Sequence, residues 1–285
     1  EQQEIKWVAV NADSLNSFRM PRQNGMPRQG FFNNGYLYLT YIADKETTAL
    51  LNTKGGSSVY VNGALHTGDP YASGWLYIPV KLKKGLNEFY IRSGFQTTAS
   101  LIFPAKSIDL HTGDPTLPVV VLQNNNALLQ GAVVVINSSS KPLRNLKIQS
   151  SIAGKEMITT LPVIPAMSTR KVPFSFNAAN ITQKGKHKMT LVLSDAKKLL
   201  DEQHVFLEVV EQGQSYSNTF VSAIDGSIQY YAVTPQSGSD TTNAALFLSV
   251  HGAGVEAIGQ ARAYKPKDWG TLVAATNRRP RGFNW

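Results

Sequence analysis

Residues 36–42 read Tyr-Leu-Tyr-Leu-Thr-Tyr-Ile, a stretch rich in the aromatic and β-branched side chains that β-strands favour. Similar stretches follow, and glycine-containing turns such as Lys54-Gly55-Gly56 separate them. Asn62-Gly63 predicts a two-residue type I′ turn between two antiparallel strands. Short strands divided by turns in this way predict a β-sandwich over residues 1–115.

Two segments of this first region resemble the jelly-roll accessory domains of secreted glycan-active enzymes. They read Val-Tyr-Val-Asn-Gly at residues 59–63 and Leu-Lys-Lys-Gly-Leu-Asn-Glu-Phe-Tyr-Ile-Arg at residues 82–92. The resemblance implies a jelly-roll-like accessory domain. Tyr71, Trp75 and Tyr77 are candidates for a platform on which a sugar ring stacks, although aromatic residues in such strands more often belong to the core.

Residues 116–212 predict a second β-sandwich. Residues 146–152 and 171–176 alternate between apolar and polar side chains, which is the period of a strand with one buried face. About seven such strands without helical periodicity predict an immunoglobulin-like domain. The chain has no cysteine, so the disulfide of antibody domains is absent and the prediction depends on the strand pattern alone.

Residues 213–285 form the third predicted segment, in which the pattern changes. A hairpin is expected around Asp225-Gly226. The uninterrupted apolar run at residues 245–250 predicts a parallel strand buried on both faces. A short helix within residues 252–263 and a second buried strand at residues 271–276 complete a βαβ unit.

The apolar run leads into His251, Gly252, Ala253 and Gly254. A strand followed by His-Gly-x-Gly and a helix resembles the oxyanion loop of α/β-hydrolases of the prolyl-oligopeptidase/esterase superfamily. Glycines in such a loop let backbone N–H groups approach the oxygen that becomes negative in the transition state. The resemblance implies that these four residues help to build the oxyanion hole of a serine esterase or peptidase. The alternative is a structural turn in which the imidazole of His251 has its own partner.

No catalytic triad is assigned within the chain. In α/β-hydrolases the nucleophile, the acid and the histidine all follow the oxyanion loop, and no Gly-x-Ser-x-Gly segment occurs here. Because one βαβ unit cannot cover its own faces, we expect the natural protein to continue beyond Trp285 and to supply the triad there. The 285 residues alone are accordingly predicted to be inactive.

Composition argues against several classes of partner. Lysine and arginine total 28 against 19 aspartate and glutamate, but the +9 charge is spread out, so no nucleic-acid partner is expected. No apolar run approaches the ~20 residues that span a bilayer. The five histidines are scattered and cysteine is absent, so neither a metal nor a cofactor is predicted. The repeated His-Thr-Gly-Asp-Pro at residues 66–70 and 111–115 predicts turns rather than calcium sites.

Two functions from different classes stay open. The first is the N-terminal region of a periplasmic or extracellular serine hydrolase whose substrate is an ester, a peptide or an acylated glycan, with carbohydrate contact by the first sandwich. The alternative is a non-catalytic scaffold whose β-sandwiches bind a glycan or another partner. The expected fold class is mainly β, with two sandwiches followed by the incomplete start of an α/β-hydrolase sheet.

Overall fold

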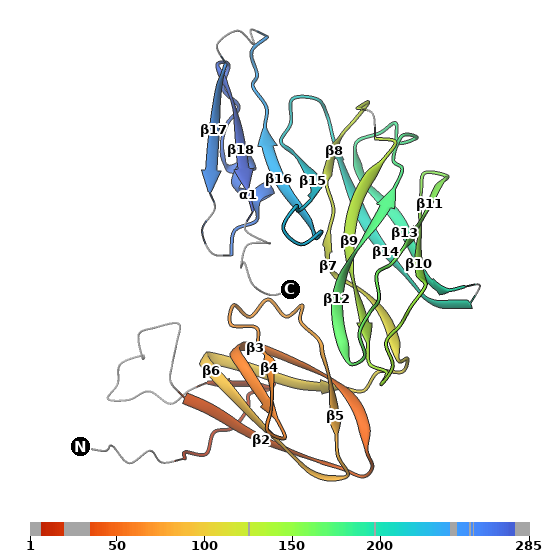
Figure 1. Ribbon diagram of the computed structural model, residues 1–285. Coiled ribbons are helices and arrows are strands. Elements are labelled where there is room, and N and C mark those ends of the chain that lie inside the picture. The colour runs from red at the N-terminus through yellow and green to blue at the C-terminus, as the bar shows by residue number, and fades with distance from the viewer. Residues whose placement is uncertain are drawn as a thin grey trace, which may run out of the picture. The chain divides into compact units, whose positions relative to one another are not determined.

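A computed structural model describes residues 7–19, 35–124, 126–196, 198–239, 244–250, 252 and 254–276. The chain divides into two compact units, Glu1–Ala105 and Lys106–Trp285. Both units consist mainly of strands (Figure 1), and the described residues contain one short α-helix. The prediction of a mainly β protein is therefore confirmed. The division into segments at residues 115 and 212 stays a prediction.

The first unit is one antiparallel sheet of six strands. Its strands are β1 (Ser17–Arg19), β2 (Gly35–Ala43), β3 (Thr47–Val61), β4 (Ala64–Thr67), β5 (Ile78–Leu82) and β6 (Gly85–Ile102). The two long strands, β3 and β6, pair with each other; β1 and β2 add to β6, and β4 and β5 add to β3. Each short strand pairs with a different half of its long neighbour, so the sheet bends over a single core.

Glycines in the middle of the long strands permit this bend. Gly55 has a φ of 81°, and a Cβ there would lie 2.0 Å from the carbonyl oxygen of Gln96. A Cβ at Gly94 would lie 2.7 Å from the carbonyl oxygen of Gly55. The register of β3 and β6 shifts at the same place. The glycine pair that was expected in a turn therefore lies inside β3 and marks a β-bulge.

The predicted turn at Asn62-Gly63 is confirmed. The two residues have φ values of 49° and 85°, as a type I′ turn requires, and they connect Val61 of β3 to its partner Ala64 of β4.

The second unit contains two sheets. The larger sheet consists of β8 (Val119–Val121), β10 (Leu146–Ile152), β11 (Lys155–Thr160), β13 (Gly185–Asp195), β14 (Lys198–Val210), β15 (Tyr216–Val221), β16 (Ile228–Thr234), β17 (Ala245–Val250) and β18 (Gly270–Ala275). The smaller consists of β7 (Ile108–Thr116), β9 (Leu129–Asn137) and β12 (Ser168–Phe176). Their strand orders are β11-β10-β13-β14-β8-β15-β16-β18-β17 and β12-β9-β7.

The smaller sheet packs against β10, β11, β13 and β14 and encloses the main core, as the predicted second sandwich requires. Strand alternation fills this core. In β10, Leu146 and Ile148 are fully buried while Lys147 between them is exposed. Phe174 and Phe176 of β12 are also fully buried, with ring centroids 5.9 Å apart.

The larger sheet continues beyond this sandwich and ends at β17 (Figure 1). Strands β17 and β18 run parallel, and α1 (Ala257–Ala263) connects them and packs on β16 and β18. The prediction that residues 245–250 are buried on both faces is wrong, because Leu246, Leu248 and Val250 are 73%, 72% and 77% exposed. The physical reason is that α1 lies on one face of the sheet, and no described residue covers those three side chains on the other.

Candidate functional site

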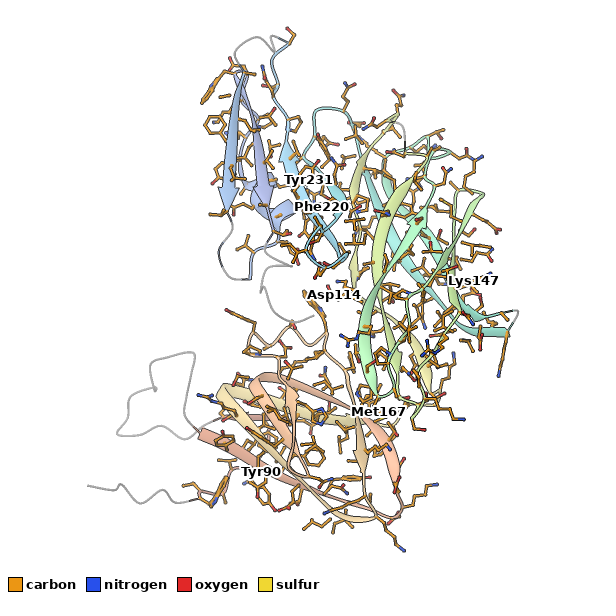
Figure 2. The ribbon with its side chains drawn as sticks, in the orientation of Figure 1. Tyr90, Asp114, Lys147, Met167, Phe220 and Tyr231 are labelled. Atoms are coloured by element: carbon orange, nitrogen blue, oxygen red, sulfur yellow. The ribbon has the colours of Figure 1, made fainter. Side chains whose placement is uncertain are left out.

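The outer face of the first unit carries aromatic side chains in register across four strands. Tyr38 of β2 pairs with Tyr90 of β6, Tyr90 pairs with Tyr60 of β3, and Tyr60 pairs with Leu65 of β4. We call Tyr38, Tyr90, Tyr60 and Leu65 the tyrosine row. Figure 2 marks Tyr90 on this sheet.

Strand alternation explains why the tyrosine row points outward. In β2, β3 and β6 the neighbouring residues Leu37, Val59 and Ile91 are buried in the core of the first unit. Because successive side chains of a strand point to opposite faces, the tyrosines lie on the solvent side. Tyr38 is 38% exposed and Leu65 is 62% exposed.

The aromatic rings contact one another. The ring centroids of Tyr38 and Tyr90 are 4.8 Å apart with the planes tilted by 34°, and the ring of Trp7 lies 5.9 Å from that of Tyr38. Trp7 is 68% exposed, so it extends the aromatic surface into solvent. Both centroid separations lie within the about 4.5–7 Å at which aromatic rings contact each other.

Polar groups flank the tyrosine row on both sides. The hydroxyl of Tyr38 donates a hydrogen bond of 2.9 Å to Oε1 of Glu88, and this carboxylate raises the pKa of Tyr38. Arg92, which is exposed, lies two residues beyond Tyr90 on the same face and pairs with Tyr36 of β2. The row is therefore an apolar strip between a carboxylate and a guanidinium group.

The sequence prediction chose other aromatic residues for this role. Tyr71, Trp75 and Tyr77 lie in the segment between β4 and β5, are partly buried, and are not members of the tyrosine row. The signal for the observed site was present in residues 36–42, where tyrosines occur at positions 36 and 38 with leucines between them and after them. That alternation predicts one aromatic face and one apolar face for the strand.

The predicted oxyanion loop is described only in part. His251 and Ala253 lie outside the described residues. Gly252 is exposed, and Gly254 has a φ of 81°, a conformation that glycine adopts without strain. The role of these four residues as an oxyanion loop stays a prediction from sequence.

The two His-Thr-Gly-Asp-Pro copies adopt different structures. Asp69 of the first copy is buried in a loop, where its carboxylate accepts hydrogen bonds from the backbone N–H groups of Ser73 and Gly74. Asp114 of the second copy lies inside β7 and forms an ion pair with Lys171. Both aspartates thus have structural roles. The described residues hold no cluster of three or more His, Cys, Asp or Glu side chains placed to bind a metal ion.

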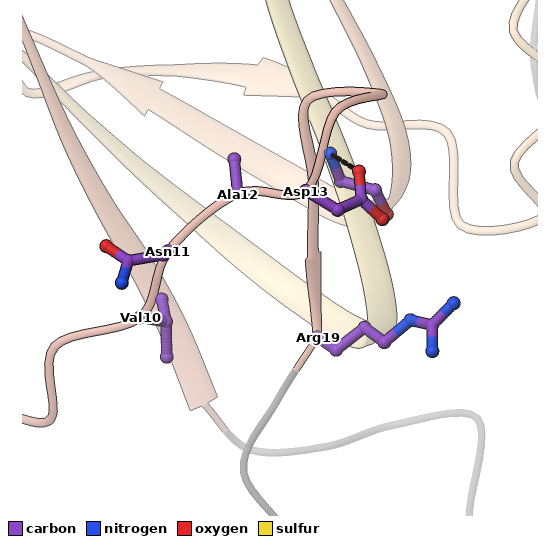
Figure 3. Close-up of a pocket in the computed structure, with 6 residues that line it drawn as sticks. Val10, Asn11, Ala12, Asp13 and Arg19 are labelled. Carbon is purple, nitrogen blue, oxygen red and sulfur yellow. Dashed lines mark hydrogen bonds between the residues drawn. The ribbon is translucent and has the colours of Figure 1, made fainter.

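An open hollow lies next to β1 and is lined by residues of the N-terminal segment: Val10, Asn11, Ala12, Asp13, Ser17 and Arg19. Figure 3 shows its side chains. The Oδ1 atom of Asp13 accepts hydrogen bonds from the backbone N–H groups of Leu15 and Ser17. This carboxylate shapes the turn that leads into β1, so we do not take the hollow as the functional site.

No protein-family model and no curated protein sequence matches the chain. Among solved structures it is similar to the exo-chitosanase of Amycolatopsis orientalis (13% identity, covering 73% of this chain and 30% of that chain, TM-score 0.30). It is also similar to a glycosyl hydrolase family 2 member from Bacteroides cellulosilyticus (12% identity, covering 77% of this chain and 32% of that chain, TM-score 0.33). A third similar structure is the β-glucuronidase of Ruminococcus gnavus (12% identity, covering 68% of this chain and 36% of that chain, TM-score 0.29). The chain thus spans about a third of each protein, and at these TM-scores the similarity assigns neither a family nor an activity.

The identification as an α/β-hydrolase of the prolyl-oligopeptidase/esterase superfamily is wrong. The three solved structures named above are an exo-chitosanase, a family 2 glycosyl hydrolase and a β-glucuronidase, and none of these three is named as a serine hydrolase. The expected parent, a serine esterase or peptidase, is wrong on the same finding. A sheet of that kind would also be covered by helices on both faces, whereas β17 is open on one face.

Among the described residues, no helix is long and apolar enough to cross a membrane.

Proposed function

We propose that the first unit is a non-catalytic accessory module that binds polysaccharide through the tyrosine row. The observation that carries the proposal is the in-register alignment of Tyr38, Tyr90 and Tyr60 on a solvent-facing sheet surface. Aromatic side chains contact a sugar by packing against its C–H groups. The role that we propose for the row is therefore binding.

The dimensions of the tyrosine row favour an oligosaccharide over a single sugar. Neighbouring strands lie about 4.8 Å apart, so a row across β2, β6, β3 and β4 extends for about 14 Å. Trp7 adds a further exposed ring beside Tyr38. A surface of this length accommodates more than one sugar ring.

The flanking groups suit the hydroxyls of a sugar. Each tyrosine has an apolar body and a polar tip, so it packs against one face of a sugar and hydrogen-bonds at its edge. The guanidinium group of Arg92 donates hydrogen bonds, and the carboxylate of Glu88 accepts them. The proposal includes the periplasmic or extracellular location that was expected from the sequence.

Binding of soluble oligosaccharides by isothermal titration calorimetry tests the proposal. The panel contains oligosaccharides of β-linked glucosamine, galactose and glucuronic acid, since one stacking surface accepts sugars that differ in their substituents. We expect at least one to bind, and Tyr38→Ala and Tyr90→Ala each to weaken its binding by about fivefold, because one aromatic contact contributes about 1 kcal/mol.

The second unit supplies a matched control. Phe220 of β15 and Tyr231 of β16 form an aromatic pair with ring centroids 6.2 Å apart, labelled in Figure 2. Phe220 is 45% exposed, so Phe220→Ala removes a comparable ring at another surface. The Phe220→Ala variant is expected to bind the oligosaccharides as tightly as the wild type does. Failure of every oligosaccharide to bind, or equal loss in Phe220→Ala and Tyr38→Ala, would overturn the proposal.

A further inference from the structure

A second row of side chains runs beside the tyrosine row. Tyr36 of β2 pairs with Arg92 of β6, Arg92 pairs with Ser58 of β3, and Ser58 pairs with Thr67 of β4. We call Tyr36, Arg92, Ser58 and Thr67 the arginine row. Its members lie two residues from those of the tyrosine row along each strand, so both rows are on the same face of the sheet. Glu88 lies on the other side of the tyrosine row. A ligand on the tyrosine row therefore meets a cation along one edge and an anion along the other.

The two charges differ in how far they are already engaged. Oε1 of Glu88 accepts the hydrogen bond from the hydroxyl of Tyr38, and Glu88 is partly buried. Arg92 is exposed, and across the described ranges of the chain its guanidinium group makes no hydrogen bond or ion pair. The two residues are four positions apart on β6, about 13 Å, so they do not neutralise each other. The guanidinium group is therefore the charge that is available to a ligand.

A guanidinium group distinguishes an acidic sugar from a neutral one. Its N–H donors form a planar fork that matches both oxygens of a carboxylate. Hydrogen bonds to an ionised acceptor are roughly twice as strong as those to a neutral one, such as a sugar hydroxyl. Uronic acids are sugars that carry a carboxylate, so they gain more from this position than neutral sugars do.

The charge of the first unit acts in the same direction. Residues 1–105 contain ten lysines and arginines against seven aspartates and glutamates. A net positive charge attracts an anionic chain. On the other edge, the carboxylate of Glu88 repels an acidic group but accepts hydrogen bonds from hydroxyls. An acidic sugar is therefore oriented with its carboxylate toward Arg92.

We propose that the polysaccharide bound by the tyrosine row is acidic, and that Arg92 binds the carboxylate of a hexuronic acid unit in it. This inference rests on the proposed function, since it names the class of saccharide for the same surface. The rings of the tyrosine row pack against neutral and acidic sugars alike, and they supply affinity. Arg92 adds the preference for the acidic sugar, so it is a specificity-determining residue.

Calorimetric titration with a matched pair of ligands tests the inference. The pair is an oligosaccharide of β-linked glucuronic acid and the same oligosaccharide after reduction of its carboxyl groups, which makes it an oligosaccharide of glucose. We expect the acidic member to bind about fivefold more tightly at low salt, because an exposed ion pair contributes up to about 1 kcal/mol. Added salt should reduce this ratio of affinities, since it screens exposed charges.

Three variants separate preference from affinity. Arg92→Gln should remove the difference between the two ligands. Tyr90→Ala should weaken both by the same factor, because its ring packs against both sugars. Lys81→Gln is the control for the loss of one positive charge and should keep the ratio of the wild type. Lys81 is exposed on β5 and pairs with Thr48, at the other end of β3 from Tyr60.

The outcomes distinguish failure of this inference from failure of the proposed function. If no saccharide of the panel binds, the proposed function is overturned. If saccharides bind but the two members of the pair bind equally, or if Arg92→Gln and Lys81→Gln change their ratio alike, saccharide binding stands and the role of Arg92 is overturned. A sulfated oligosaccharide of glucose that binds more tightly than the glucuronic acid oligosaccharide would overturn the choice of a carboxylate.

Discussion

The Nζ atom of Lys171 lies 2.7 Å from Oδ2 of Asp114, and the two side chains are only 11% and 0% exposed. Asp114 belongs to β7 and Lys171 to β12, which flank β9 on opposite sides in the smaller sheet of the second unit. The ion pair therefore ties together two strands that do not pair with each other. Solvent screens the attraction between such buried charges only a little.

Lys171→Met is expected to destabilise the protein by about 3–5 kcal/mol, because it leaves the buried Asp114 carboxylate without this cation. The free energy of unfolding from urea denaturation measures the effect. Lys184→Met is the control, since its ion pair with Glu211 has side chains that are 63% and 54% exposed. Its expected cost is about 0–1 kcal/mol. Equal costs for the two variants would contradict the role given to the Asp114 pair.

Gly55→Ala should be more damaging than Gly63→Ala, although both glycines have positive φ. Each substitution costs about 1–2 kcal/mol for the left-handed conformation. At Gly55 the new Cβ would also meet the carbonyl oxygen of Gln96, whereas at Gly63 no atom lies within 4 Å. We expect about 1–3 kcal/mol more for Gly55→Ala, measured by thermal or urea unfolding. Equal destabilisation would mean that the close approach of β3 and β6 is not what requires Gly55.

The lowered pKa of Asp201 predicts that the protein loses stability in acid. Burial acts to raise the pKa of Asp201, but hydrogen bonds from Lys106 and from the backbone N–H of Leu110 outweigh it and hold the pKa below its ordinary value. A depressed pKa stabilises the folded state above the unfolded value of about 3.9, and this contribution disappears as the pH falls through the folded value. The stability difference between wild type and Asp201→Asn should therefore shrink below about pH 4, as measured by urea unfolding from pH 7 to 3.

Asp109→Asn provides a control of opposite sign at the same place. Burial, together with the charge of Asp201, raises the pKa of Asp109. A raised carboxyl pKa destabilises the folded state progressively as the pH rises above about 3.9. Asp109→Asn should therefore gain stability relative to wild type as the pH rises. The same pH trend in both variants would show that these two shifts do not control acid stability.

Strand content could be predicted from sequence because alternation is a local signal. Residues 36–42 and 146–152 form strands as expected, and the turn at Asn62-Gly63 follows from two residues alone. The place of Gly55 could not be predicted in this way. Its glycine pair is the signal for a turn, and only the distant carbonyl of Gln96 shows that the chain instead continues as a bent strand.

Burial and the candidate site depend on contacts that sequence does not contain. The apolar run at residues 245–250 predicts burial on both faces, yet the structure leaves Leu248 exposed, since burial requires a neighbour as well as an apolar side chain. The tyrosine row could not be predicted from the sequence for a similar reason. Tyr38 and Tyr90 are 52 residues apart, and only the pairing register of β2 and β6 makes them neighbours.

The hydrogen bond from Tyr38 to Glu88 predicts a measurable titration. A carboxylate that accepts the phenol proton's hydrogen bond favours the neutral phenol, so it raises the pKa of Tyr38 above the ordinary value of about 10. Glu88→Gln removes the negative charge and should bring the pKa of Tyr38 back down. Ultraviolet titration of the tyrosinate band measures the change, with Tyr38→Phe identifying the contribution of this residue among the 11 tyrosines. Glu202→Gln, on β14 of the second unit, is the control and should leave the titration unchanged. If Glu88→Gln also leaves it unchanged, Glu88 does not hold Tyr38, and the ring is oriented by its contacts with Trp7 and Tyr90 alone.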